Sequence, residues 1–141
     1  MIVGFNLTKI HIERKKAVKG KIKVSHDLRF EKVEKRPLPL KDKKDVLFVE
    51  FLFQIMYEPG IGEATLGGDV LYYADAKKVD ELAAQWNKQK KLPADVTAEL
   101  LNVILSRCNV KTLLLTNELN LPAHLPLPQI SLKEDASKYI G

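Results

Sequence analysis

Three histidines and one cysteine are the residues best suited to carry chemistry, and they are spread along the whole chain. His11, His26 and His124 lie far apart, and none has a second ligand at the spacing of a helical or Cys-x-x-Cys metal site. Cys108 with His124, or Ser25 with His26, would supply a nucleophile and its base, but no supporting motif surrounds either pair. We therefore expect no metal, no cofactor and no enzyme activity, and we interpret Cys108 as a buried, reduced thiol.

The glycine-rich stretch GIGEATLGG, residues 60–68, is the next candidate because such loops cradle phosphates. Read as a Walker loop, it has Gly68 where a lysine is required. Read as a dinucleotide loop, it has Thr65 in place of the third glycine, and the pattern after it predicts a strand, not a helix. The stretch is better explained as a hairpin turn followed by a bulge or a close backbone approach at Gly67-Gly68.

His11 and His26 lie in the first half of the chain, where the pattern predicts strands. Residues 2–13 alternate polar and apolar side chains with a change of phase near Thr8-Lys9, which predicts a strand with a bulge. A second strand is expected from Gly20 to Val33, and the polar stretch 36–45, broken by proline, is expected to cross over to the third.

The third predicted strand, residues 46–57, is apolar on both faces, and Glu50 and Gln54 interrupt the apolar sequence. It forms a predicted hairpin with residues 63–73 through the turn Glu58-Pro59-Gly60-Ile61-Gly62. An antiparallel sheet normally shows one face to water, so such a strand in a chain of this size predicts a cover on each face. Helices are the expected cover on one side, and a second subunit is the candidate for the other.

Two helices and an extended strap follow the hairpin. Asp75 is the predicted N-cap of a short amphipathic helix. Pro93 is placed at the first position of a longer helix that runs to about Asn120 and is apolar over much of its circumference.

The segment ELNLPAHLPLPQI, residues 118–130, contains three prolines that exclude a helix, and we interpret it as an apolar strap over the subunit's own surface. A docking peptide for SH3-type domains is disfavoured because the P-x-x-P spacing and flanking basic residues are missing.

Length and charge bound the remaining possibilities. The 141 residues fit one domain, no apolar run approaches the roughly 20 residues that span a bilayer, and the amino terminus lacks a signal-peptide pattern, so we expect a cytoplasmic protein. Residues 1–44 carry 14 Lys or Arg against 5 Asp or Glu, whereas the rest of the chain carries 9 against 13. The basic half could bind nucleic acid or acidic proteins, or its lysines could simply be solvated and protect sheet edges from pairing.

The apolar hairpin, the segment GGDVLYYAD, the long helix ADVTAELLNVILSRCNVKTLLL and the strap LNLPAHLPLPQI together resemble the SecB-type protein-export chaperones, and more closely the small lysine-rich SecB-like proteins of archaea. The resemblance extends from about residue 46 to residue 130, with a weaker trace in FNLTKIHIER. It implies an α+β fold, a twisted four-stranded antiparallel sheet with a short and a long C-terminal helix on one face. The single expected domain, 1–141, divides into a sheet (1–73), helices (75–120) and a Pro-rich strap and tail (121–141).

The resemblance also implies a function. Members of the family assemble as dimers of dimers, and the bacterial ones hold unfolded polypeptides in apolar grooves before handing them to a translocase. The implied activity is an ATP-independent holdase, a dimer or tetramer that binds unfolded or nascent polypeptides. The groove would comprise the crossover, aromatic residues of the hairpin and the strap leucines, namely Leu38, Leu40, Phe51, Phe53, Tyr72, Tyr73, Leu121, Leu125 and Leu127.

Two features depart from the bacterial pattern and keep alternatives open. This chain is basic, whereas bacterial members present an acidic sheet face to the translocase, and the acidic tail is replaced by KEDASKYIG. A translocase contact is therefore unsupported. The alternatives are a nucleic-acid-binding protein that uses the basic N-terminal strands, and a carrier of apolar ligands or an interaction protein of the same fold without chaperone activity.

Overall fold

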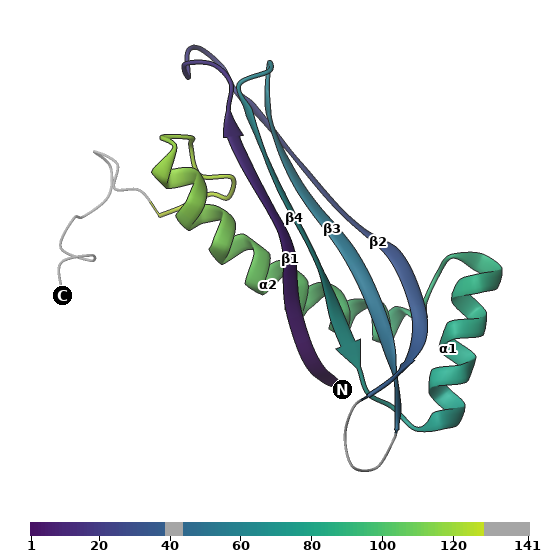
Figure 1. Cartoon of the computed structure of the whole chain (residues 1–141). Helices are drawn as coiled ribbons and strands as arrows, with labels where there is room; N and C mark the ends of the chain where they lie inside the picture. Colours follow the sequence, from purple (N-terminus) through teal and green to yellow (C-terminus); the bar gives the residue numbers. More distant parts are fainter. Residues whose placement is uncertain (39–43, 129–141) are drawn as a thin grey trace.

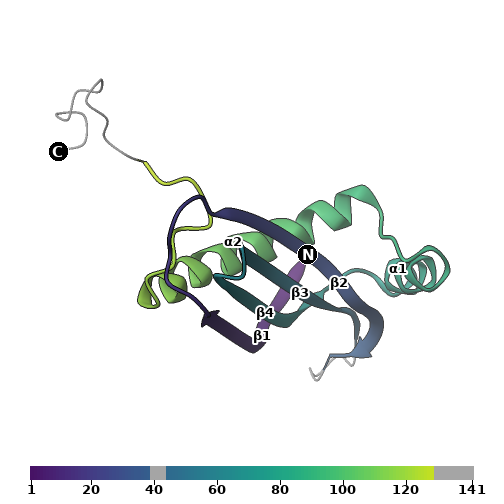
Figure 2. The ribbon, with the colours of Figure 1, turned by 90° about the horizontal axis from the view of Figure 1, so that it is seen from above.

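The chain folds into a four-stranded antiparallel sheet followed by two helices, in a computed structural model that describes residues 1–38 and 44–128 (Figure 1). The strands lie in the order β1-β4-β3-β2, so β1 and β2 form the two edges. The sheet is twisted and carries both helices on one face (Figure 2), which confirms the predicted fold class. The elements are β1 (Ile2–Arg14), β2 (Lys23–Pro37), β3 (Asp45–Glu58), β4 (Gly62–Tyr72), α1 (Ala76–Gln89) and α2 (Ala94–Glu118).

The ladder between β1 and β4 contains the irregularities that the sequence predicts. Its register shifts between Ile2 and Gly4 and again between Leu7 and Lys9, and the second shift is the predicted bulge. Opposite this bulge, Gly68 lies so close to β1 that a Cβ atom on it would overlap the carbonyl oxygen of Asn6. The close backbone approach predicted at Gly67-Gly68 is therefore confirmed at Gly68.

The two faces of β3 are covered differently. Alternate residues from Leu47 to Tyr57 point toward the helices and are almost fully buried in the core. On the other face, the Arg36 guanidinium lies 3.5 Å from the centroid of the Phe48 ring and helps to bury it, while Met56 stays 37% exposed. Part of the predicted second cover thus comes from the chain's own β2, and a contribution from a second subunit stays a prediction.

Capping groups set the ends of α1. The Asp75 carboxylate accepts a hydrogen bond of 2.9 Å from the Lys78 backbone N–H, which confirms the predicted N-cap. At the other end, Lys90 has φ 54° and its backbone N–H donates to the Trp86 carbonyl, so the chain reverses there. Pro93 is the residue before α2 and not its first helical residue, a difference of one position from the prediction.

One side of α2 lies on the sheet. Its buried residues recur at every fourth position: Val96, Leu100, Ile104, Cys108, Thr112 and Thr116. Cys108 is a buried thiol, as expected, and burial raises its pKa to about 11, so the thiol is protonated at neutral pH. Part of the remaining apolar circumference of α2 is open to solvent, since Val110 is 59% and Leu114 63% exposed. Neither helix of the described part of the chain combines the length and hydropathy needed to span a membrane.

Candidate functional site

An open apolar groove lies where α1 and α2 diverge beside the edge strand β2, on the side of the molecule where Figure 1 shows α1. It has a volume of about 510 Å³, and two exposed lysines lie next to its apolar walls. We call it the junction groove; its residues are Phe30 of β2, Trp86 of α1, Lys90, Lys91 and Leu92 of the connection, and Ala94, Thr97, Ala98 and Leu101 of α2.

Two aromatic side chains form the centre of the junction groove. The rings of Phe30 and Trp86 are 6.2 Å apart and tilted by 55°, a favourable arrangement for an aromatic pair. Phe30 points to the helix side of the sheet because it is paired in register with the core residue Phe51. It stays half-buried, since β2 is an edge strand and the chain reverses at Lys90 before α2 begins. The result is aromatic surface that this subunit leaves accessible.

A second, smaller groove lies at the C-terminal end of α2. It has a volume of about 200 Å³ and is bounded by the last turns of α2 and by the strap. Leu114 and Leu127 on its walls are 63% and 54% exposed. We call it the strap groove; its residues are Leu113, Leu114, Thr116, Asn117, Leu121, Ala123 and Leu127.

A third hollow, of about 560 Å³, lies between β1 and α2. Asn102, Ser106 and Arg107 contribute polar groups to its walls, and the Arg107 guanidinium lies 5.4 Å from the centroid of the Phe5 ring. Although it is the largest of the three, its polar lining suits an apolar segment less well than the junction groove does.

The structure separates the residues that the sequence predicts for the groove. Phe51 and Phe53 are each 1% exposed and Tyr72 is 5% exposed, so in a single subunit these side chains belong to the core and cannot touch a bound chain. Leu121 and Leu127 come together in the strap groove, where Leu121 is buried and Leu127 exposed.

Three further members of the predicted groove lie elsewhere. Tyr73 is half-buried near the start of α1, where its hydroxyl accepts a hydrogen bond of 3.0 Å from Lys44 Nζ. Leu38 and Leu125 are also half-buried, and Leu40 lies outside the described residues. The predicted set therefore does not converge on one place, and the junction groove contains none of it. The sequence pattern predicts Phe30 as an apolar residue of a strand and Trp86 as an apolar residue of an amphipathic helix. It does not predict that the two side chains are in contact.

The strap is anchored to the body of the molecule by two polar contacts. The Tyr57 hydroxyl donates a 2.8 Å hydrogen bond to the Pro122 carbonyl, and His124 Nε2 lies 2.9 Å from Asn109 Oδ1. Because an amide oxygen only accepts, Nε2 carries the proton and Nδ1 does not. The His124 ring is 4% exposed and lies 5.7 Å from the ring of His26. Burial, with His26 as a smaller cause, lowers the pKa of His124 to about 4.

This arrangement predicts that the protein loses stability in mild acid. The pKa of His124 is about 4 in the folded chain and about 6.5 when exposed, so the unfolded state binds more protons as the pH falls through this window. We expect the free energy of unfolding to be about 1–2 kcal/mol lower at pH 5 than at pH 7. Urea denaturation at both values, in the wild type and in His124→Gln, measures the effect. The variant cannot titrate at this position, so an equal loss in both proteins would assign the effect elsewhere.

The combination of sheet order, helix placement and strap defines a class of structure, the SecB-like fold. A solved structure similar to this chain is that of the SecB-like chaperone Rv1957 of Mycobacterium tuberculosis, determined in complex with a ChAD peptide from the antitoxin HigA1 (Rv1956). The TM-score is 0.50 and the identity 15%, over 92% of this chain and 90% of that one. No protein-family model and no curated protein matches the sequence. The likeness confirms the predicted fold, whereas the closer resemblance to archaeal members stays a prediction.

Proposed function

We propose that the protein is an ATP-independent holdase, a non-enzymatic cytoplasmic chaperone that binds non-native polypeptides through exposed apolar grooves. The single observation that carries the proposal is the junction groove, where the half-buried side chains Phe30, Trp86 and Leu101 line one open hollow. The presence of a bound peptide in the similar Rv1957 structure supports a polypeptide ligand. The open shape suits a passing chain, whereas a carrier of a small apolar molecule would enclose most of its ligand.

The groove would recognise composition more than sequence. Burial of apolar surface contributes about 25 cal/mol per Å² and has no directional requirement, so different apolar or aromatic side chains can occupy the same walls. Lys90 and Lys91 lie beside the groove, and the Lys90 ammonium is 5.8 Å from the centroid of the Trp86 ring. Client segments with acidic residues next to apolar ones would gain from both lysines.

Self-association is the second part of the proposal. Exposed apolar side chains lie on α2 and on the edge strand β1, at Leu105, Val110, Leu114, Val3 and Ile10. In a dimer or a tetramer, a second subunit would cover these side chains and bury the side of α2 that is exposed in a single subunit. Size-exclusion chromatography with light scattering measures the assembly directly, and a strictly monomeric protein at micromolar concentration would remove this part.

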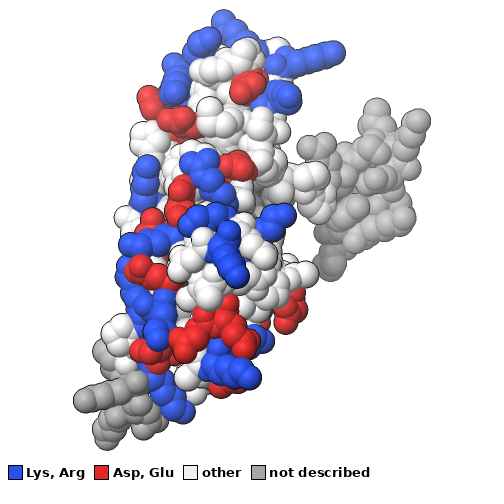
Figure 3. All heavy atoms as spheres, turned by 90° about the vertical axis from the view of Figure 1, so that its right-hand side faces the viewer, with Lys and Arg blue, Asp and Glu red and all other residues white. Residues whose placement is uncertain are grey.

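Nucleic acid is a less favoured partner because the basic strands carry their own counter-charges. Arg29 pairs with Asp27 and Glu31 within β2, and Lys35 reaches Asp80 of α1 at 2.9 Å. Figure 3 shows basic and acidic side chains interspersed over this side of the molecule, without a continuous basic stripe. A basic patch or stripe is the usual footprint of a surface that binds the phosphate backbone.

The test of holdase activity is suppression of aggregation without nucleotide. We expect an equimolar amount of the protein to reduce the light scattering of a thermally denatured client such as citrate synthase by at least half. The physical reason is that the grooves cover apolar segments that would otherwise associate. Lysozyme at the same concentration, which has a similar size and is also basic, is the control for non-specific charge effects. Unchanged aggregation at equimolar and at fivefold excess would exclude the proposed function.

A further inference from the structure

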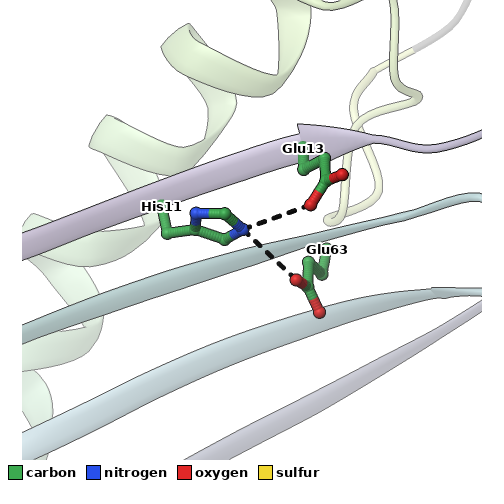
Figure 4. Close-up of side chains that lie close together, drawn as sticks. All are labelled: His11, Glu13 and Glu63. Carbon is green, nitrogen blue, oxygen red and sulfur yellow. Dashed lines mark ion pairs between the residues drawn. The ribbon is translucent and has the colours of Figure 1, made fainter.

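Three potential metal ligands meet on the face of the sheet opposite the helices, away from both grooves. His11 and Glu13 are alternate residues of β1 and point to the same face, while Glu63 of β4 is the cross-strand neighbour of Glu13. His11 Nε2 lies 3.4 Å from Glu13 Oε2 and 3.3 Å from Glu63 Oε1, and Figure 4 shows both carboxylates turned toward the same nitrogen. The ligand atoms of all three residues lie within 4.8 Å of one another.

The two separations from His11 Nε2 have the size that a tetrahedral zinc ion requires. Zinc binds imidazole nitrogen and carboxylate oxygen at about 2.0–2.1 Å, so two ligands at a tetrahedral angle are about 3.3–3.4 Å apart. An octahedral ion with bonds of that length would bring adjacent ligands to about 2.9 Å. The two distances from His11 Nε2 therefore match the tetrahedral geometry, and the ligand oxygens of Glu13 and Glu63 lie within 4.8 Å of each other. A water molecule would supply the fourth ligand.

The charge of the cluster also favours a cation. Glu13 and Glu63 bring two negative charges to one imidazole, and the Lys15 ammonium lies 3.8 Å from Glu63 Oε2. The Lys15 ammonium compensates the charge of one carboxylate, and a divalent ion bound to His11 Nε2 would compensate the charge of the other. The ligand side chains are 50%, 48% and 25% exposed, so an ion has free access from solvent.

We propose that His11, Glu13 and Glu63 form a zinc-binding site that ties the edge strand β1 to the central strand β4. The sequence contains no helical or Cys-x-x-Cys ligand spacing, but in the structure a His-x-Glu pair on β1 meets a ligand across the ladder on β4. The site is independent of client binding because it lies on the opposite face of the sheet from the junction groove. Its consequence is a folded state that zinc stabilises.

The experiment uses the full chain, treated with chelator and dialysed, and titrated with zinc chloride at pH 7.5 by isothermal calorimetry. We expect one zinc ion per chain with a dissociation constant in the micromolar range, and a rise in melting temperature of about 5 °C or more at a hundredfold excess over that constant. His11→Ala and Glu63→Gln should each weaken binding by about tenfold or more. Glu50→Gln, which changes another exposed carboxylate of the same face, is the matched control and should bind as the wild type does.

Cobalt chloride provides a second readout that a merely electrostatic cluster would not give. A tetrahedral cobalt complex absorbs strongly in the visible range, whereas an octahedral one is nearly colourless, and we expect the strong band in the wild type and its loss in His11→Ala. Absence of stoichiometric zinc binding, or equal binding by the wild type and both ligand variants, would overturn the site. A weak octahedral cobalt spectrum would overturn the tetrahedral assignment. None of these results depends on chaperone activity.

Discussion

Replacing Trp86 by alanine should weaken the binding of an unfolded client by about tenfold or more, which corresponds to about 1.4 kcal/mol or more. Trp86 is the largest apolar side chain of the junction groove, and it also positions Phe30 through their aromatic contact. Partly buried tryptophans often dominate binding because they bring a large rigid apolar surface at little entropic cost. The dissociation constant for permanently unfolded α-lactalbumin, labelled with a fluorophore and measured by anisotropy, gives the effect.

The controls separate lost binding from lost folding. Trp86→Phe keeps an aromatic ring opposite Phe30 and should restore most of the affinity, which a general loss of structure would not allow. Because Trp86 is only half-buried, the alanine variant should lose about 1–2 kcal/mol of stability and remain folded by circular dichroism. Unchanged affinity in a folded Trp86→Ala variant would move the client site away from the junction groove. The strap groove would then be the next surface to test.

Local chemistry explains the parts of the fold that the sequence predicts well. The change of phase near Thr8-Lys9 forces a bulge, because two successive residues cannot point to the same face of a regular strand. Asp75 predicts a helix start because its carboxylate can accept from the free N–H groups of the first turn. Each of these signals is contained in a few neighbouring residues.

The candidate site could not be predicted in the same way, because it depends on which elements become neighbours. β3 is apolar on both faces, and alternation alone does not tell which face the helices cover. The sequence therefore does not distinguish a groove position for Phe51 and Phe53, which the resemblance implies, from the core position that they have in the structure. Phe30 and Trp86 come from β2 and α1, and only the sheet order and the divergence of the two helices place them together. The contact of His11 with Glu63 likewise depends on the register between β1 and β4.

Gly68→Ala should be the most destabilising glycine-to-alanine substitution in the sheet, and we expect it to lower the free energy of unfolding by about 3 kcal/mol or more. Its Cβ atom would overlap the Asn6 carbonyl oxygen and come within 3.1 Å of Leu7 Cα. Both are backbone atoms of β1, so no side-chain rotation relieves the overlap and the strand itself must shift. Urea denaturation followed by the fluorescence of the chain's single tryptophan measures the loss.

Gly67→Ala is the matched control, because it makes the same chemical change one residue away. A Cβ on Gly67 would meet only ordinary neighbours, Lys9 Cβ at 3.4 Å and Leu52 Cδ1 at 3.6 Å. Its effect should stay within about 1 kcal/mol, since the strain is absent and the unfolded chain loses some freedom. If both variants unfold at the same urea concentration, β1 does not approach β4 as closely as described. A large loss for Gly68→Ala alone would show that the β1 bulge, predicted from a change of phase in the sequence, requires a glycine opposite it.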